Sequence, residues 1–341
     1  MEFMVAESIV SALKQVATIP LNQNDSLLFQ GKQLPINSDD FSPLQNLNLE
    51  KEVFFIDGGQ AELLVASNFV LAYLRVAAVG FKGLKKTAIE TFEAYVLVSA
   101  SGNNGSIVYS AKLFDVKGKA SSLVDNELLK VNSEDQLFRS GIGRAPITKL
   151  VSMTRRFLEL GLAKEISSKE GSVVVLDGTL DARYPGEEKI VSLLPENVVA
   201  LAKSSQLFTA SGGSPTVSLS KLSPFLESAW IHSFDSHLHF VKLHPKSNHI
   251  FRFSGSKEYA ALLIELSTDP IFLGYPYPLI LVDRLARVSD REKSRLRSQF
   301  LLRKDLSELR EFLATSDAHG ILDRVGEKSF YLELDFELIW Q

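Results

Sequence analysis

The chain has 341 residues, of which 45% are hydrophobic and 23% are charged, which is the ordinary balance of a folded globular protein. That composition excludes wholesale disorder and a fibrous repeat. Because the sequence contains no cysteine, a disulfide scaffold, a thiolate zinc site, an iron–sulfur cluster and a cysteine nucleophile are excluded as well. The formal net charge of −4 argues against a polycation that coats nucleic acid.

The sequence shows no targeting or membrane signal. Glu2 and Glu7 stand where a signal peptide needs basic residues. The apolar stretch 270–282 is interrupted by glycine and proline, and it is shorter than the roughly 20 apolar residues that span a bilayer. We therefore expect a cytoplasmic protein without a membrane partner.

Hydrophobic periodicity in the first half of the chain predicts an N-terminal helix followed by strands. Residues 3–17 have near-helical apolar spacing, whereas residues 18–50 are polar and predict a connecting arm with short elements. Exposed apolar residues of the helix could form a partner surface, but packing on its own domain is the commoner arrangement. The other elements predicted here are strands at 53–56, 71–81 and 94–98, a hairpin turn at 103–105 with a strand at 107–109, and helices and loops over 115–145.

The second half alternates helical and strand-like patterns. The predicted elements are a helix at 147–164, a buried strand at 173–176, a helix at 195–203, a loop at 211–215, strands within 230–253, a helix at 258–266, a loop over 270–283 that runs into a helix through about 304, and a strand at 330–334. The fold class is therefore α/β. We expect one large domain over 51–341, preceded by the N-terminal helix and arm at 1–50.

Two apolar runs end in the same dipeptide, at Asp57-Gly58 and at Asp177-Gly178. An ionised aspartate at the end of a buried strand is costly unless a cation pairs with it. Two such ends on adjacent strands would place like charges side by side, and a divalent ion would relieve the repulsion. Oxygen ligands favour Mg²⁺ or Mn²⁺. The alternative is that both dipeptides are simple turns.

Further carboxylates lie where they could complete such a site. Glu159 is on the predicted helix that leads into the second strand, and Asp283 ends the apolar run after Gly274. Each has an ordinary alternative: Glu159 could form a surface salt bridge with its arginine neighbours, and Asp283 could cap the following helix.

Three blocks of this sequence resemble the NurA nuclease family, and they occur in the family's order. They are Ile56-Asp57-Gly58-Gly59 with 62–79, the block 175–180, and Gly274-Tyr275-Pro276-Tyr277-Pro278-Leu279 with 283–287. The resemblance implies an RNase H-like core related to the Piwi fold, with a mixed sheet flanked by helices. It also implies a homodimeric, Mn²⁺-dependent deoxyribonuclease, with Mg²⁺ as the other candidate ion. The expected activity is 5′–3′ exonucleolytic, with endonuclease activity as a further option, in DNA end resection with a hexameric HerA-type ATPase translocase.

The resemblance also assigns roles by position. Asp57 and Asp177 match the motif aspartates that bind metal, and Glu159 is the best match to the acidic residue upstream of the second motif, with Glu165 also in reach. Tyr275 matches a functional tyrosine. Asp283 stands where family members carry a histidine, which leaves the metal preference at that position open. The expected catalytic residues are Asp57, Glu159, Asp177, Tyr275 and Asp283, all but the tyrosine being metal ligands.

The mechanism we expect is two-metal phosphodiester hydrolysis. One ion would lower the pKa of the attacking water and the other would stabilise the leaving 3′ oxygen. Asp57 would bridge the two ions, while Asp177, Glu159 and Asp283 would complete their shells.

A basic segment follows the third block. Residues 284–304 contain eight basic and two acidic side chains, and phosphate contacts need only a local basic face. The alternative is a solvated helix. The predicted DNA-binding residues are Arg284, Arg287, Arg291, Lys293, Arg295 and Arg297.

Three competing functions remain open from sequence alone. His237 and His239, with Asp235 near, have a spacing that zinc hydrolases use, although an ordinary half-buried strand is the commoner explanation. An ATP-binding RNase H-like domain of the actin and sugar-kinase type would use the loop 211–214 for phosphate. A non-catalytic adaptor could keep the fold and clamp an ATPase.

Overall fold

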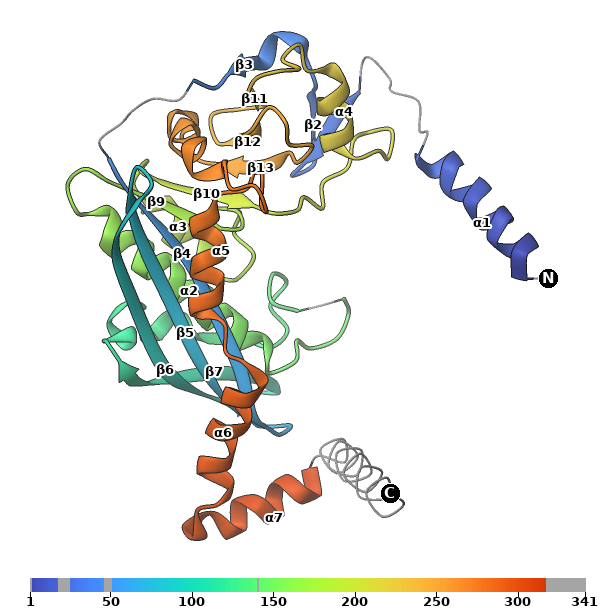
Figure 1. Cartoon of the computed structure of the whole chain (residues 1–341). Helices are drawn as coiled ribbons and strands as arrows, with labels where there is room; N and C mark the ends of the chain where they lie inside the picture. The colour runs from blue at the N-terminus through green and yellow to red at the C-terminus, as the bar shows by residue number, and fades with distance from the viewer. Residues whose placement is uncertain (1, 18–24, 46–50, 140, 317–341) are drawn as a thin grey trace, which may run out of the picture.

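The computed structural model describes residues 2–17, 25–45, 51–139 and 141–316. Its body is a mixed sheet of eleven strands with helices on both faces (Figure 1). The elements, in chain order and with η marking a 3-10 helix, are α1 (Glu2–Ala17), β1 (Ser26–Phe29), β2 (Lys32–Pro35), η1 (Ser38–Asp40), β3 (Phe41–Pro43), β4 (Glu52–Val65), β5 (Phe69–Lys82), β6 (Lys85–Asn103), β7 (Ser106–Lys117), η2 (Ala120–Ser122), η3 (Asn126–Leu129), β8 (Lys130–Asn132), α2 (Lys149–Ser167), β9 (Ser172–Asp177), α3 (Glu187–Ser192), β10 (Val198–Ala202), α4 (Pro215–Leu222), β11 (Trp230–Ser233), β12 (Leu238–Lys242), β13 (Phe251–Ser254), η4 (Lys257–Leu263), η5 (Glu265–Ser267), α5 (Tyr277–Ala286), α6 (Asp290–Leu301), η6 (Lys304–Leu306) and α7 (Ser307–Ser316).

The centre of the sheet has the order β6-β5-β4-β9-β10. The first three strands of the chain in this group, β4, β5 and β6, form an antiparallel meander. The chain then passes through α2, and β9 returns parallel to β4 while β10 lies parallel to β9. This arrangement confirms the expected RNase H-like mixed sheet flanked by helices.

Alternation along β4 divides the core into two halves. Phe54 and Ile56 face α2, and Val53 and Phe55 face α5, because successive side chains of a strand point to opposite faces. Residues of α2 and α5 are buried in these respective halves, and the two helices cover opposite faces of the sheet (Figure 1). Burying a large apolar side chain contributes about 1.5–3 kcal/mol, so both helices are firmly anchored beside β4.

The first Asp-Gly dipeptide does not end its strand, so that prediction is wrong. β4 continues through Gly58 and Gly59 to Val65. A Cβ at position 58 would collide with the Glu159 carboxylate of α2, and a Cβ at position 59 would collide with the carbonyl of Ala286 at the end of α5. The two glycines therefore permit close approach from both faces of the sheet, rather than a turn.

Three other sequence predictions are corrected by the structure. The predicted helix at 195–203 is instead the strand β10, whose five residues are all buried in a short apolar run, a pattern that periodicity alone cannot tell from a buried helix. The predicted helix at 258–266 forms two 3-10 helices. The predicted helix through 304 is interrupted between α5 and α6, where the Ser289 side chain accepts a hydrogen bond from the Glu292 amide at 3.2 Å and starts a new helix.

Other predicted elements are confirmed. They include α1, the hairpin turn between β6 and β7, α2, β9 and the three strands within 230–253. Part of the segment 115–145, expected to hold helices and loops, belongs to β7 and β8. The strand predicted at 330–334 lies outside the described residues.

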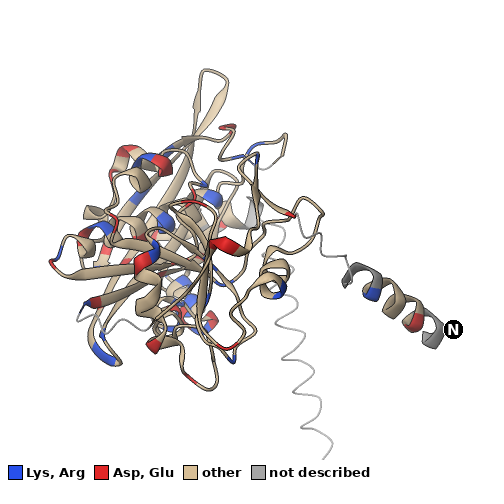
Figure 2. Cartoon of the chain, turned by 90° about the horizontal axis from the view of Figure 1, so that it is seen from above, with Lys and Arg blue, Asp and Glu red and all other residues tan. Residues whose placement is uncertain are grey.

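The segment before residue 50 contributes to the body. The strand β3 pairs with β11 at the edge of the large sheet, and Leu27 of the β1–β2 hairpin is fully buried beside β11, β12 and α4. By contrast, α1 extends away from the body (Figures 1 and 2), and Ile9, Val10 and Leu13 are exposed. The expected packing of α1 on its own domain is not seen within the described residues, and the domain division at residue 50 stays a prediction.

Among the residues that the structure describes, no helix combines the length and apolarity needed to cross a bilayer.

The approach of α5 to β4 gives a test of the fold. Gly59→Ala should lower the free energy of unfolding by about 1–3 kcal/mol, because the new methyl group meets the backbone carbonyl of Ala286. The control is Gly102→Ala in β6, where a Cβ meets nothing within 4 Å. Urea denaturation monitored by circular dichroism measures both. Equal stability of the two variants would contradict the packing described here.

Candidate functional site

Two aspartates meet on neighbouring parallel strands. Ile56 of β4 pairs with Leu176 of β9, so the next residues, Asp57 and Asp177, are level with each other. By alternation both side chains project toward the α5 face. Asp57 accepts a hydrogen bond from the Gly58 amide at 2.7 Å. The structure thus places the two predicted strand carboxylates side by side at the middle of the sheet.

Lys203 and Tyr275 complete the site on the α5 face. Lys203 follows β10, and its Nζ lies 2.6 Å from Oδ2 of Asp177. The same Nζ lies 5.7 Å from the centroid of the Tyr275 ring. The Tyr275 hydroxyl is buried and has no hydrogen-bond partner within the described part of the chain. Sequence reasoning missed Lys203, whose only signal is a lysine directly after a short apolar run.

The Gly-Tyr-Pro-Tyr-Pro block fixes the position of Tyr275. Gly274 has a φ of +89°, and a Cβ there would collide with the Ser247 side chain, so the position requires glycine on two grounds. Pro276 and Pro278 flank the first residue of α5, where their fixed φ suits a helix start. The backbone therefore enters α5 in a restricted conformation. This places the Tyr275 side chain near Lys203 and the aspartates.

Asp283 lies inside α5, not before a helix, so the N-cap alternative is wrong. Its Oδ2 is 3.3 Å from Nη2 of Arg287. Its negative charge acts on Asp177, Lys203 and Tyr275. Asp283 therefore belongs to the same cluster of charges as the strand aspartates.

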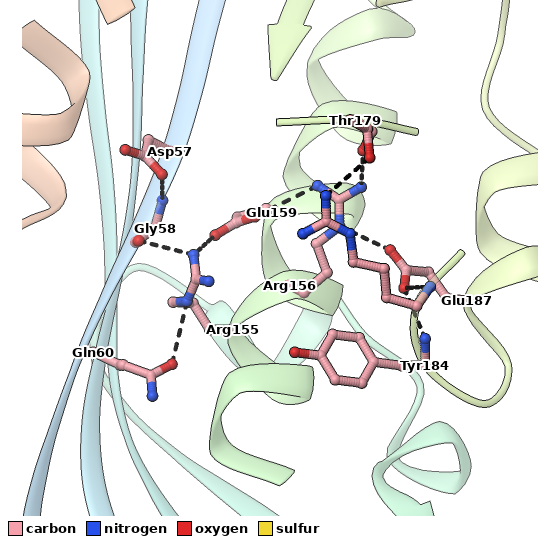
Figure 3. A network of polar contacts seen from close by, with 10 residues as sticks. Asp57, Gly58, Gln60, Arg155, Arg156, Glu159, Thr179, Tyr184 and Glu187 are labelled. Carbon is pink, nitrogen blue, oxygen red and sulfur yellow. Dashed lines mark hydrogen bonds and ion pairs between the residues drawn. The ribbon is translucent and has the colours of Figure 1, made fainter. Parts of the chain in front are cut away.

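Glu159 reaches the cluster from the opposite face of the sheet. It pairs with both arginine neighbours, as the alternative from the sequence held, but it is only 3% exposed, so these ion pairs are buried and not on the surface. Its carboxylate lies against Gly58 and binds Arg155, whose guanidinium also donates to the Gly58 carbonyl at 2.9 Å and to Oε1 of Gln60 at 3.2 Å (Figure 3). Glu165 is exposed further along α2. The structure therefore brings Glu159, not Glu165, beside Asp57.

A second buried network supports Glu159 from behind. Nη1 of Arg156 lies 3.7 Å from Oε2 of Glu159, and its Nε donates to the fully buried Glu187 at 2.8 Å. Its Nη2 donates to the carbonyl of Thr179 at 2.6 Å (Figure 3). Glu187 also accepts from the amide of Arg183 at 2.7 Å. This network connects α2, which carries Glu159, to the segment after Asp177. It therefore restrains the position of Glu159 relative to Asp177. Apart from the pair of Arg156 with Glu159, the sequence carried no signal for it.

Burial and mutual repulsion disturb the ionisation of the cluster. Burial raises the pKa of Asp57 to about 7, and the charges of Asp177 and Glu159 add to this effect. Burial also raises the pKa of Asp177, although the ammonium of Lys203 opposes the shift. Burial and the three aspartates raise the pKa of Tyr275, which keeps its hydroxyl protonated. At neutral pH the Asp57 carboxyl is therefore only partly ionised.

The donor chemistry of the cluster suits a hard divalent cation. All candidate ligands are carboxylate oxygens, which Mg²⁺ and Mn²⁺ prefer, and the buried, unpartnered Tyr275 hydroxyl lies among them. As placed, however, Asp177 is paired with Lys203 and Glu159 with Arg155. No three histidine or carboxylate side chains of the described residues converge closely enough to hold an ion between them.

The basic segment after α5 divides into exposed and enclosed residues. Arg284, Arg287, Arg291 and Arg295 are exposed, whereas Lys293 and Arg297 are half-buried. Nε of Arg297 is enclosed without a partner in the described structure. The DNA-binding prediction is untested, but the four exposed arginines are those that a phosphate backbone could reach. Acidic and basic positions are mixed over the rest of the body (Figure 2).

An ion-pair network that sequence reasoning missed anchors the start of α6. Arg75 of β5 lies 2.5 Å from Oε1 of Glu292 and 3.0 Å from Oε1 of Glu93. It also donates to the carbonyl of Arg287 at 3.2 Å, and Tyr73 donates to Glu93 at 2.5 Å. The bend between α5 and α6 is therefore fixed against the sheet next to Gly59, the residue that pairs with Arg75.

The structure gives local explanations for the competing motifs. His239 is buried, with Nδ1 2.9 Å from the Ser233 hydroxyl and Nε2 3.0 Å from the Gly255 carbonyl, whereas His237 is exposed. In the loop 211–214, Ser211 donates to the Asp25 carboxylate at 2.7 Å. A carboxylate in that place opposes phosphate binding. Neither the zinc nor the ATP alternative gains support.

A family model described as the NurA domain matches residues 51–288. The match covers more than half of the chain. This protein belongs to the NurA family. Membership supports a nuclease, and the matched residues contain every carboxylate of the cluster described above.

The NurA chain also has distant structural neighbours. Human endonuclease V is 14% identical, with a TM-score of 0.37 over 73% of this chain and 86% of that one. Ciona intestinalis endonuclease V, in complex with DNA containing an inosine, is 17% identical, with a TM-score of 0.36 over 72% and 87% of the two chains. A. aeolicus Argonaute is 10% identical, with a TM-score of 0.32 over 70% and 28%. Comparison with curated protein sequences gives no match.

The repulsion at Asp57 predicts that this NurA protein is more stable without that charge. Below pH 3.8, the pKa of Asp57 in the unfolded chain, its carboxyl is protonated in both the folded and the unfolded state. The free energy of unfolding then falls as the pH rises from 3.8 toward about 7, the pKa of Asp57 in the folded protein. At pH 8 in EDTA, Asp57→Asn should therefore raise Tm by about 2–6 °C, and the gain should shrink toward pH 4. Asp39→Asn, at an exposed site, is the control. A lower Tm for Asp57→Asn at pH 8 would contradict the electrostatic picture.

Proposed function

We propose that this NurA protein is a divalent-metal-dependent DNA nuclease, with Mn²⁺ as the preferred ion and Mg²⁺ as the other candidate. The observation that carries the proposal is the arrangement of two carboxylates around Asp57: Asp177 is level with it on the next strand, Glu159 approaches from the other face, and the charges of both act on it. Burying like charges together lowers the stability of the folded protein, and proteins keep such arrangements mainly at functional sites. Buried carboxylates with raised pKa values are typical of catalytic sites.

The metal ligands in this proposal are Asp57, Asp177, Glu159 and Asp283. Asp57 interacts electrostatically with both Asp177 and Glu159, so a divalent ion held by these residues would relieve the repulsion at its carboxylate. When bound, such ions acidify water and stabilise negative charge on the phosphate and the leaving oxygen. Asp283 supplies an oxygen where a histidine is usual in the family, which strengthens the preference for hard ions.

The remaining residues of the site position these ligands and the substrate. Arg155 and Arg156 hold the Glu159 carboxylate on both sides. The raised pKa of Tyr275 keeps its hydroxyl protonated, so Oη can donate a hydrogen bond to a phosphate oxygen. Because the Gly274 and Tyr275 amides are hydrogen-bonded and the ring of Pro276 fixes its φ, this donor is preorganised, which is the arrangement that stabilises developing charge most effectively.

The DNA would lie along α5 and α6. Arg284 is on α5, Arg291 and Arg295 are on α6, and all three are exposed. The site aspartates lie on the α5 face of the same sheet, so the exposed arginines could hold the phosphate backbone on one side of the cluster. Such contacts are independent of base sequence, which suits a nuclease that degrades a strand progressively.

The biological role that we propose follows from the family. The protein would act as a homodimer in double-strand-break end resection, as a 5′–3′ exonuclease fed by a hexameric HerA-type ATPase translocase. Size-exclusion chromatography coupled to light scattering, with and without the translocase, tests the dimer and the complex together.

One observation favours a second candidate function, a non-catalytic adaptor that clamps an ATPase. The cluster carries its own cations, since Lys203 pairs with Asp177 and Arg155 with Glu159. An adaptor that had lost its chemistry would keep such pairs as structural ion pairs. It would bind the translocase and show no Mn²⁺-dependent cleavage.

Carboxylate substitutions separate the two functions. Asp57→Asn and Glu159→Gln should each reduce Mn²⁺-dependent digestion of end-labelled linear DNA by about 100-fold or more, because each removes a charge that holds the metal. Glu165→Gln, on the exposed part of the same helix, should keep wild-type activity. Full activity of both site variants, or no activity of the wild type with Mn²⁺, Mg²⁺ and the translocase, would overturn the nuclease proposal.

Salt dependence tests the DNA path. Replacing Arg284, Arg291 and Arg295 together with alanine should lower the slope of log Kd against log salt by about 2–3, since each arginine releases roughly one counterion on binding a phosphate. Binding is measured by fluorescence anisotropy in EDTA. The matched control replaces Lys85, Lys86 and Lys119, which are exposed and lie outside α5 and α6. An unchanged slope in the arginine variant would place the DNA elsewhere.

A further inference from the structure

Lys203 stands at the end of a strand that points into the carboxylate cluster. Leu201 of β10 pairs with Asp177 of β9, and the Gly178 amide donates to the Leu201 carbonyl at 3.0 Å. Leu201 belongs to the core half that α5 covers. Two residues further on, Lys203 projects to that same side, where Asp57, Asp177 and Asp283 gather.

The ammonium group has one close partner and room for others. Its Nζ lies 2.6 Å from Oδ2 of Asp177, and the charges of Asp283 and Asp57 also act on it. An ammonium carries three donors, and the side chain is 48% exposed, so donors remain available to a molecule that enters the site. The nearby Tyr275 ring, 5.7 Å away, limits where the ammonium can move.

Arg155, another cation of the cluster, is placed differently from Lys203. Its guanidinium is committed to the Gly58 carbonyl, the Gln60 side chain and the Glu159 carboxylate, on the α2 side of the sheet. Lys203 is a point charge on a flexible stem, and it faces the side from which DNA would approach. The two cations therefore cannot have the same role.

We propose that Lys203 is a further catalytic residue, which neutralises Asp177 in the metal-free protein and contacts a non-bridging oxygen of the scissile phosphate when a divalent ion binds Asp177. This assignment rests on the proposed metal-dependent nuclease function. A divalent cation bound to Asp177 would repel the Lys203 ammonium. Metal binding would therefore separate Lys203 from the Asp177 carboxylate. The released charge then lies beside the reacting phosphate, where a fixed positive group stabilises the charge that develops.

The experiment compares Lys203→Met, Lys203→Arg and Lys221→Met in the full chain. Lys221 is an exposed residue of α4, a helix that carries no residue of the site. It serves as the matched control. Calorimetric titration with Mn²⁺ alone should show about fivefold tighter binding to Lys203→Met, because the competing cation is gone. At saturating Mn²⁺, the same variant should cleave linear DNA about 100-fold more slowly. Lys203→Arg should recover part of the cleavage, and Lys221→Met should match the wild type in both measurements.

Several outcomes would overturn the assignment. Unchanged or weaker Mn²⁺ binding by Lys203→Met would show that the ammonium does not compete with the ion. Unchanged cleavage at saturating Mn²⁺ would make Lys203 a counter-ion without a catalytic role. Circular dichroism checks folding, and Lys203→Gln replaces the methionine variant if that one does not fold. The wild-type protein tests the proposed function separately from Lys203. If the wild type neither binds Mn²⁺ nor cleaves DNA, the proposed nuclease function itself is wrong.

Discussion

The enclosure of several carboxylates at one point of the sheet is the constraint on which the rest of this structure depends. Asp57 and Asp177 are level on adjacent strands, and Glu159 approaches from the other face. Buried like charges repel strongly, so every neighbouring element supplies compensation. Arg155 and Arg156 come from α2, and Lys203 comes from the end of β10. These charged side chains fix the relation of one helix to three strands.

The support of the site extends well beyond its carboxylates. Glu187 is fully buried and receives hydrogen bonds from Arg156 and from the backbone after Asp177. On the other face, Arg75 binds Glu292 and the carbonyl of Arg287. The first network holds the chain that leaves β9, and the second holds the chain that leaves α5. The two segments that carry Asp177 and Asp283 are therefore each held soon after these residues.

The sequence could predict those parts of the molecule that local patterns specify. The two Asp-Gly dipeptides, the helix with Glu159 and the Gly-Tyr-Pro-Tyr-Pro block are visible as residues, and the structure brings all of them together. The role of Gly58 and Gly59 could not be read locally, because it depends on α2 and α5 arriving from distant parts of the chain. The apolar run that forms β10 is compatible with a helix as well as a strand, because five buried residues have no diagnostic period. Lys203 and Arg75 act through partners far away in the sequence, so no motif marks them.

The missing side chain at position 58 has a consequence for how such sites change over time. Asp57 and Glu159 lie on opposite faces of a single sheet, and the opening between them exists only because residue 58 has no Cβ. Substitution there closes the opening without altering any charged group. A lineage could thus lose the chemistry while all its carboxylates persist. In a related sequence, the residue after the first aspartate therefore has to be compared together with the acidic residues, because a side chain there would displace the glutamate on the helix.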